Sequence, residues 1–326
     1  MRSKYLVPAK LKDLQAELLN LLKIIDRVCR ENDIEYWLEA GTLLGAVRHG
    51  GFIPWDDDID ISVPAGSYLQ LITALDAESK TSKDIFLYYE HNNVPKNGIE
   101  KVATTQMMMR TKGVMSACFV DIFPARMISK SDMEKDLSII NVNQYFDGGS
   151  TTKIGVEIDK KYIKNNFKDA FLEKEKFTQY YHFEYLPSCD YRGDGGIIKR
   201  SSMEYYLGVD SYFPYSDVFP LQKITFEGFA FSCPSNVESY LTTWFDDYMT
   251  MPPKSHRVSK HADQLFFCSS AQFAKKATTN YLVEQSKEFY YFSIRRFVKD
   301  WSIRIGIFDK FKKFDMTLKK FKNFGL

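Results

Sequence analysis

Three aspartates carry the chemistry that this sequence suggests most strongly. Asp58 and Asp60 alternate with isoleucines in the run Asp-Asp-Asp-Ile-Asp-Ile, and Asp121 stands between a valine and an isoleucine. Side chains two residues apart in a strand point to the same face, so the first run predicts two carboxylates on one face of a strand. A neighbouring strand could bring Asp121 beside them, while the apolar residues of both strands turn toward the core.

Clustered carboxylates need compensating charge, because two unit charges about 4 Å apart repel by roughly 4 kcal/mol at a surface-like dielectric. Hard divalent cations such as Mg²⁺ (or Mn²⁺) prefer these oxygen ligands. Two such ions can clamp a phosphate and lower the pKa of an attacking hydroxyl, and phosphoryl transfer needs little beyond positioning and charge neutralisation. The pattern therefore predicts a catalytic metal site formed by Asp58, Asp60 and Asp121.

A glycine and a threonine that precede the acids are candidates for binding a phosphate. Gly41 and Thr42 lie between a predicted strand and a predicted helix, where exposed amides can face an anion and the threonine hydroxyl can donate a hydrogen bond. Taken singly, an acidic run is often a solvated turn, a glycine commonly ends a strand, and Asp121 could be a buried, hydrogen-bonded acid. The ordered combination is more specific for phosphoryl chemistry.

Two residues close to the acidic run could contact a substrate. Arg48 could pair with a donor phosphate, which suits its planar guanidinium, or equally with an aspartate of the loop. Trp55 could stack on the base of a donor or fill the core beneath the acidic strand, and the core is the favoured interpretation.

Several basic residues farther along the chain are weaker candidates. His256, Arg257 and His261 follow a Pro-Pro stop and could reach a phosphate, but a surface position is at least as well supported. Lys101 and Arg110, on an expected strand, rank lower still.

Hydrophobic periodicity predicts the elements that must position these residues. Helices are expected at 9–31, 42–48, 67–75 and 236–248, and strands at 34–38, 58–63, 85–90, 101–110 and 118–123. Pro124 is expected to close the last of these strands, and a hairpin with Glu227-Gly228 at its turn is expected over 223–232. Helix, strand, helix, several strands and then helices is an order typical of an α+β or mixed α/β domain.

Composition places the chain among ordinary globular proteins. It has 326 residues, 44% of them hydrophobic, and a formal net charge of +2, so no polyanion such as nucleic acid is an expected partner. Five widely spaced cysteines without a C-x-x-C predict free thiols in a reducing compartment. The polar N-terminus predicts no secretory signal, and no run of about 18 apolar residues predicts a spanning helix. These features predict an intracellular, cytoplasmic protein.

Residues 36–61, which read YWLEAGTLLGAVRHGGFIPWDDDIDI, closely resemble the signature of the LicD family. Residues 120–124 and the stretch 219–253 resemble later parts of the same family, so the likeness covers roughly 10–125 and 215–262. The family includes bacterial phosphocholine transferases and has the fukutin-related proteins among its relatives. No cysteine cluster here resembles the zinc site of the fukutin-related proteins, so no such site is predicted.

The resemblance implies a nucleotidyltransferase-like fold, which we expect as an α+β mixed sheet flanked by helices, with an insertion and a C-terminal helical tail. It implies transfer of a phospho-alcohol, such as phosphocholine or a polyol phosphate, from a CDP-linked donor to a glycan hydroxyl. Carried over by position, it makes Asp58 and Asp60 paired metal ligands and Asp121 a third ligand or the base. Asp56 and Asp57 would support these ligands or orient the loop.

Two alternatives stay open on the same residues. A nucleotidyltransferase would take an NTP, attack its α-phosphorus and release pyrophosphate, using the same metal site. A non-catalytic partner in glycan assembly would bind divalent ions without turnover, although acids at all three positions argue against it.

The expected organisation has four parts: 1–130 as the nucleotidyltransferase-like core, 131–215 as an insertion that could bind the acceptor, 216–265 as the C-terminal part of the domain, and 266–326 as a basic helical tail. From 295 to 326, ten Lys or Arg stand against three Asp, a net charge of +7. A bulky apolar stripe runs through this stretch, which suits an anionic membrane surface, or alternatively docking on its own domain or a second subunit. The membrane is favoured, because lipid-linked glycans are plausible acceptors, and peripheral attachment to the inner face of the plasma membrane would follow.

Overall fold

The computed structural model describes residues 4–89, 100–111, 113–134, 153–154, 195–201, 210–259 and 261–280. Nearly all of these belong to a compact unit, Met1–Thr278, and Thr279–Leu326 form a second unit. The basic stretch at 295–326 lies outside the described residues, as does most of the expected insertion at 131–215.

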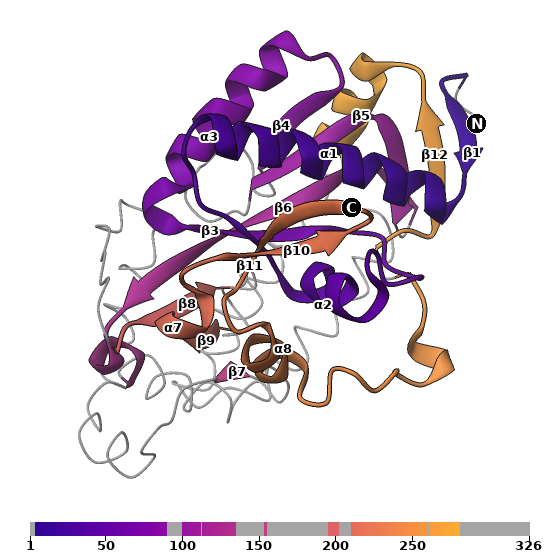
Figure 1. The fold of residues 1–326 in the computed structure, drawn as a ribbon. Coiled ribbons are helices and arrows are strands. Elements are labelled where there is room, and N and C mark those ends of the chain that lie inside the picture. The colour runs from indigo at the N-terminus through magenta and orange to yellow at the C-terminus, as the bar shows by residue number, and fades with distance from the viewer. Residues whose placement is uncertain are drawn as a thin grey trace, which may run out of the picture. The chain divides into compact units, whose positions relative to one another are not determined.

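A mixed sheet with helices packed against it forms the predicted α+β fold (Figure 1). In chain order the first elements are β1 Leu6–Ala9, α1 Leu11–Glu31, β2 Trp37–Leu38, α2 Ala40–His49, β3 Asp60–Pro64, α3 Ala65–Thr81, β4 Ile85–Tyr89, β5 Glu100–Thr111 and β6 Val114–Ile128. The described elements that follow are β7 Lys153–Ile154, β8 Ile197–Ser201, β9 Asp210–Pro214, α7 Tyr215–Val218, β10 Gln222–Phe226, β11 Phe229–Cys233, α8 Val237–Phe245, the 3₁₀ turn η2 Lys254–His256 and β12 Gln264–Cys268.

The long strands β5 and β6 form the centre of the sheet. The strand order is β1-β12-β5-β6-β8-β9-β7, with β4 also pairing with β5 and β3 joining β6 to β2. β3 runs parallel to β6, whereas β5 and β8 run antiparallel to it. Three different partners therefore meet along β6, and this strand gathers residues from distant parts of the chain.

Helices α1 and α3 pack against the central strands (Figure 1). The apolar residues of α1 recur every three or four positions, and those on this stripe, Leu14, Leu18, Leu21, Leu22 and Ile25, are fully or almost fully buried. Each buried leucine contributes about 1.5–3 kcal/mol. Among the described residues, no helix has the length and apolarity needed to cross a membrane.

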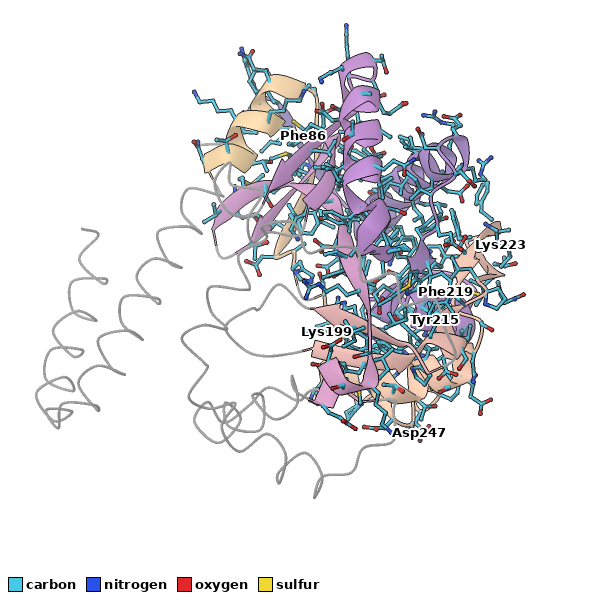
Figure 2. The ribbon with its side chains drawn as sticks, turned by 90° about the vertical axis from the view of Figure 1, so that its left-hand side faces the viewer. Phe86, Lys199, Tyr215, Phe219, Lys223 and Asp247 are labelled. Atoms are coloured by element: carbon cyan, nitrogen blue, oxygen red, sulfur yellow. The ribbon has the colours of Figure 1, made fainter. Side chains whose placement is uncertain are left out.

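Aromatic rings stack between β9 and α8 and around the short helix α7. Phe213 on β9 stacks on Tyr240 of α8, with ring centroids 4.0 Å apart. Tyr215 and Phe219, at the two ends of the short helix α7, stack in the same way at 5.0 Å (Figure 2). Such contacts add to area burial and fix α8 over this end of the sheet.

Some element boundaries differ from those that the sequence predicts. β3 begins at Asp60 rather than Asp58, and α3 extends to Thr81. β6 continues through Pro124 to Ile128, so the expectation that the proline closes the strand is wrong. The N–H of Asp121 points toward β3, so by alternation the nitrogen of Pro124 points toward the β5 edge. The described pairing with β5 ends at Ile122, so the proline interrupts no described ladder there.

The C-terminal side of the domain also differs. Residues 264–268 form β12, which pairs with β1 and with β5, so the expected helical tail does not begin at 266. The hairpin is confirmed as β10 and β11, with Glu227 and Gly228 at positive φ, the backbone conformation of a tight two-residue turn.

Replacing Gly45 by alanine should destabilise the protein, because α2 and the loop that follows it approach each other closely. A Cβ on Gly45 would lie 2.5 Å from the carbonyl oxygen of Gly51, a backbone atom that cannot move aside as a flexible side chain can. We expect Gly45→Ala to cost about 1–3 kcal/mol, the range for overpacking, visible as a lower unfolding midpoint in urea. Gly66→Ala, at an exposed position in the first turn of α3, should be neutral or slightly stabilising. Equal midpoints for the two variants would contradict this account.

Candidate active site

The parallel pairing of β3 with β6 places Asp60 directly beside Asp121. The two residues are partners in the strand register, and the N–H of Asp121 donates to the carbonyl of Ile59 at 2.9 Å. On the other edge of β6, Lys101 of β5 is the register partner of Asp121. Its ammonium forms an ion pair with the Asp121 carboxylate, and both side chains are buried, at 8% and 11% exposure. A cation and two acids thus share one face of three strands.

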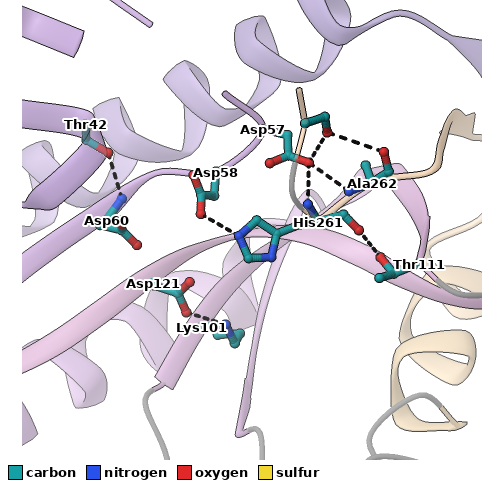
Figure 3. A network of polar contacts seen from close by, with 10 residues as sticks. Thr42, Asp57, Asp58, Asp60, Lys101, Thr111, Asp121, His261 and Ala262 are labelled. Carbon is teal, nitrogen blue, oxygen red and sulfur yellow. Dashed lines mark hydrogen bonds and ion pairs between the residues drawn. The ribbon is translucent and has the colours of Figure 1, made fainter. Parts of the chain in front are cut away.

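Asp58 joins this cluster from the residues just before β3. Its carboxylate lies 2.9 Å from the Nε2 of His261 (Figure 3). Ile59, which separates Asp58 from Asp60 in the sequence, is fully buried. The pKa of Asp60 is raised well above its ordinary value, first because the protein desolvates the carboxyl and then because Asp58 and Asp121 repel its charge. The three acids are therefore close enough for each charge to affect the next.

The neighbouring Asp58 favours the protonated form of the His261 ring. A hydrogen bond from the ring to Asp58 raises the pKa of His261 most strongly, and burial opposes that rise. For Asp58, burial acts to raise the pKa, but the hydrogen bond and the charge of His261 outweigh it, so the pKa of Asp58 is lowered. Each group thus favours the charged form of the other.

Asp57 fastens the acidic run to the segment that carries His261. One of its carboxylate oxygens accepts from the backbone N–H groups of His261, at 2.9 Å, and Ala262, at 2.7 Å, and also from the hydroxyl of Ser259. The carbonyl of His261 accepts in turn from Thr111 at the end of β5 (Figure 3). These bonds fix the position of the His261 ring relative to Asp58.

A second buried carboxylate, Glu39, lies between β2 and α2. It is fully buried and accepts hydrogen bonds from the hydroxyl of Tyr240 at 2.7 Å, the indole N–H of Trp244 at 2.8 Å and the hydroxyl of Ser62. Its own backbone N–H donates to the carbonyl of Asp60 at 3.0 Å. Because a buried charge is costly unless it is fully hydrogen-bonded, this network ties α8 to the strand that carries Asp60.

The start of α2 lies against the acidic run. Gly41 is in the first turn of the helix, where a Cβ would come within 3.2 Å of a carboxylate oxygen of Asp56. The hydroxyl of Thr42 accepts from the backbone N–H of Asp60 at 2.9 Å, and Thr42 is buried. Thr42 therefore positions Asp60, and among the described residues no acceptor engages the hydroxyl hydrogen of Thr42.

Arg48 and Trp55 lie to the side of the acids. The guanidinium of Arg48 donates to the carbonyl of Tyr248 at 2.9 Å and to the ring of His49 at 3.1 Å, and among the described residues no loop aspartate forms an ion pair with it. Trp55 is only partly buried, edge-on to His49 and beneath the guanidinium of Arg257, so the favoured interpretation of Trp55 as a core residue is wrong. The chain has already turned toward the surface at Pro54.

Sequence reasoning ranked Lys101 and His261 low and missed Glu39. Two of them carried a faint signal: Lys101 lies at the start of an expected strand, and Glu39 interrupts the apolar run that enters α2. The pairing of β5 with β6 brings Lys101 to the site, the return of the chain at Ser259 brings His261, and the packing of α8 gives Glu39 its partners.

The donor set suits a hard divalent cation. Among the described residues, Asp57, Asp58 and His261 have ligand atoms that all lie within 4.8 Å of one another, and Asp60 and Asp121 lie beside them. The three hydrogen bonds to Asp57 all reach one of its carboxylate oxygens. Asp60 and Asp121 are not part of the group within 4.8 Å, and their link to Asp58 rests on the strand register and on the effect of both charges on Asp60. The excess of oxygen ligands fits Mg²⁺ or Mn²⁺.

Comparisons with known proteins agree with the family resemblance. The model of the LicD/FKTN/FKRP nucleotidyltransferase domain matches residues 33–148. The lipopolysaccharide cholinephosphotransferase LicD of Haemophilus influenzae is 26% identical over 276 residues, which are 78% of this chain and 97% of that protein. An uncharacterized protein of Rickettsia prowazekii, RP689, is 34% identical over 111 residues, 29% of this chain and 39% of that protein. The human ribitol 5-phosphate transferase FKRP is 60% identical over 30 residues, 9% of this chain and 6% of that protein.

Asp60→Asn should stabilise the metal-free protein at neutral pH. The folded state raises the pKa of Asp60 above its ordinary value of 3.8, so folding favours the protonated carboxyl. At a pH below about 3.8 the carboxyl is protonated in both states and costs the folded protein nothing. As the pH rises through the folded-state pKa, the folded protein loses stability relative to the unfolded chain. The neutral amide avoids that loss. Thermal unfolding in EDTA should therefore show a higher midpoint for the variant at pH 7, by about 2–4 °C for each kcal/mol relieved, and no gain near pH 3.

The matched control is Asp76→Asn, which removes an exposed carboxylate paired with Lys80 on α3 and should change the midpoint little. Excess Mg²⁺ should raise the midpoint of the parent protein and leave that of Asp60→Asn nearly unchanged. A metal-free Asp60→Asn protein less stable than its parent at pH 7 would refute the repulsion.

Proposed function

We propose that this chain, a LicD-family protein by the domain that it carries over residues 33–148, transfers a phospho-alcohol group to a hydroxyl of a glycan. The observation that carries the proposal is the joint position of Asp58, Asp60 and Asp121, in a domain whose relatives are a cholinephosphotransferase and a ribitol 5-phosphate transferase. The donor we propose is a CDP-linked alcohol, such as CDP-choline, CDP-glycerol or CDP-ribitol.

Asp58, Asp60 and Asp121 are the residues that we propose to hold Mg²⁺ or Mn²⁺. Bound there, the ions would supply charge neutralisation for a diphosphate and acidify a hydroxyl near them. Lys101 and His261 already offset part of the negative charge and hold two of the acids in place. The protein therefore presents the acids in fixed orientations, which is its main contribution to phosphoryl transfer.

The proposed reaction is an in-line substitution at phosphorus. The hydroxyl oxygen of the acceptor forms a bond to the phosphorus that carries the alcohol, and the bond from that phosphorus to the CMP oxygen breaks. CMP leaves with the electron pair, and the hydroxyl proton passes to a base, for which Asp121 is the candidate. Donation from Lys101 orients Asp121 in the cluster.

A nucleotidyltransferase reaction remains the second candidate, because the matching family model is described as a nucleotidyltransferase domain. It would join a nucleotide to the acceptor and release pyrophosphate, whereas the first reaction releases CMP. A non-catalytic role in glycan assembly would give neither product. The acceptor that we propose is a cell-surface glycan or its lipid-linked precursor, and contact with the inner face of the plasma membrane through 295–326 would belong to the same proposal.

Purified protein should release CMP when it is incubated with Mg²⁺, a CDP-alcohol and a glycan acceptor. CDP-choline, CDP-glycerol and CDP-ribitol are compared first by thermal shift, since a donor that binds the folded state raises the unfolding midpoint. Asp58→Asn, Asp60→Asn and Asp121→Asn should each reduce CMP release at least about a hundredfold, because each removes a ligand of charge-neutralising ions.

Asp76→Asn, on the surface of α3, should retain the parent rate. Pyrophosphate release from an NTP, without CMP release from any CDP-alcohol, would favour the second candidate. CMP release that survives all three site substitutions would remove the proposed site.

A further inference from the structure

A buried arginine, Arg200 of β8, lies on the same sheet face as the acids. Arg200 is 5% exposed, and it is the register partner of Ala125 on β6. Because alternate residues of a strand share a face, Ala125, Phe123 and Asp121 present their side chains on one side of β6. Arg200 therefore lies on the sheet face that carries Asp121, and its guanidinium reaches back along β6 to Phe123, two residues from that acid.

Aromatic rings hold the guanidinium of Arg200. Its Cζ lies 3.6 Å from the ring centroid of Phe123 and 5.2 Å from that of Trp244. A similar contact occurs on the other side of Asp121, where the ammonium of Lys101 lies 3.7 Å from the ring centroid of Phe119. Two cations seated on aromatic rings therefore flank Asp121 along β6.

The two cations differ in their polar contacts. Lys101 forms an ion pair with Asp121, whereas the Nε of Arg200 is buried without a hydrogen-bond partner among the described residues. In the described part of the chain no carboxylate forms an ion pair with Arg200. The ring contacts orient the guanidinium but offer no oxygen acceptor, so a buried donor is left over.

A second buried group without a partner stands directly opposite. Ser211 of β9 is the register partner of Arg200, so the two side chains project from the same face of adjacent antiparallel strands. Ser211 is fully buried, and its hydroxyl also has no hydrogen-bond partner among the described residues. Neighbouring buried donors without acceptors are rare in folded proteins, and two together call for a shared acceptor.

We propose that Arg200 and Ser211 form an anion subsite that binds phosphoryl oxygens of the donor next to Asp60 and Asp121. A guanidinium gives two parallel N–H donors to a phosphate, and a serine hydroxyl adds a third donor. The identification of the anion as a donor diphosphate rests on the proposed function, but the subsite itself does not. Arg200 lies outside the residues matched by the family model, 33–148.

Inorganic pyrophosphate in the presence of Mg²⁺ is the probe, with its affinity measured by isothermal titration calorimetry. Arg200→Met keeps the length of the side chain and removes the donors, and we expect it to weaken binding about tenfold to a hundredfold, the effect of losing hydrogen bonds from a charged group. Arg200→Lys should recover part of the loss. Ser211→Ala should weaken binding about threefold to tenfold.

Two matched controls separate this subsite from general effects. Arg110→Met removes another arginine that lies over a ring, Phe266, but on an exposed part of β5. Ser116→Ala removes another buried hydroxyl without a partner, at the far end of β6. Both variants should bind pyrophosphate with an affinity within about twofold of that of the parent protein, since neither residue lies near Arg200 and Ser211 on β8 and β9.

If Arg200→Met and Ser211→Ala bind pyrophosphate as tightly as the parent protein, the proposal is overturned. The two donors would then be hydrogen-bonded to an ordered water instead. If Arg200→Met does not fold, Ser211→Ala decides alone, because it deletes a hydroxyl with no described hydrogen bond and should leave folding intact. Arg200-dependent pyrophosphate binding without turnover of any CDP-alcohol would keep the subsite and reject the proposed function. Turnover of a CDP-alcohol, together with an unchanged pyrophosphate affinity in Arg200→Met and Ser211→Ala, would keep the proposed function and reject the subsite.

Discussion

Like-charge repulsion between neighbouring carboxylates is the constraint to which the rest of the domain responds. Asp60 and Asp121 are side by side because β3 and β6 are parallel and in register, and Asp58 adds a third charge one residue before the buried Ile59. Such a cluster is unfavourable unless cations approach it. The protein supplies Lys101 and His261 directly, and the remaining charge is suited to divalent ions.

Each compensating group comes from a different part of the chain, and a packed framework must hold them together. Lys101 comes from the antiparallel partner of β6, and His261 from a loop that Asp57 anchors. Glu39, buried under Tyr240 and Trp244, links α8 to the backbone of Asp60. Buried polar networks of this kind are favourable only when every member has a partner, so they specify one arrangement of the elements.

Local patterns predicted those parts of the fold that local patterns determine. The apolar stripe of α1, the hairpin turn at Glu227-Gly228 and the acids on either side of Ile59 could each be found from spacing alone. The strand pattern around Asp121 suggested that it joins those acids, and the family resemblance implied the same grouping. Strand partners could not be found in this way, because a register is a relation between distant segments, and so β1, β8, β9 and β12 went unpredicted. The roles of Lys101, His261 and Glu39 depend on such pairings, and a lone Lys, His or Glu carries no sign of them.

The hydrogen bonds from His261 and Ala262 to Asp57 have a consequence for how the protein is made. They join residues 204 and 205 positions apart, and the bond between Tyr240 and Glu39 spans 201 positions. During synthesis the acidic run leaves the ribosome long before the segments that neutralise and anchor it. The nascent acids must therefore stay hydrated until the last strands arrive, and contacts of such high order close late in folding. The complete acidic site can therefore assemble only when the chain is nearly finished.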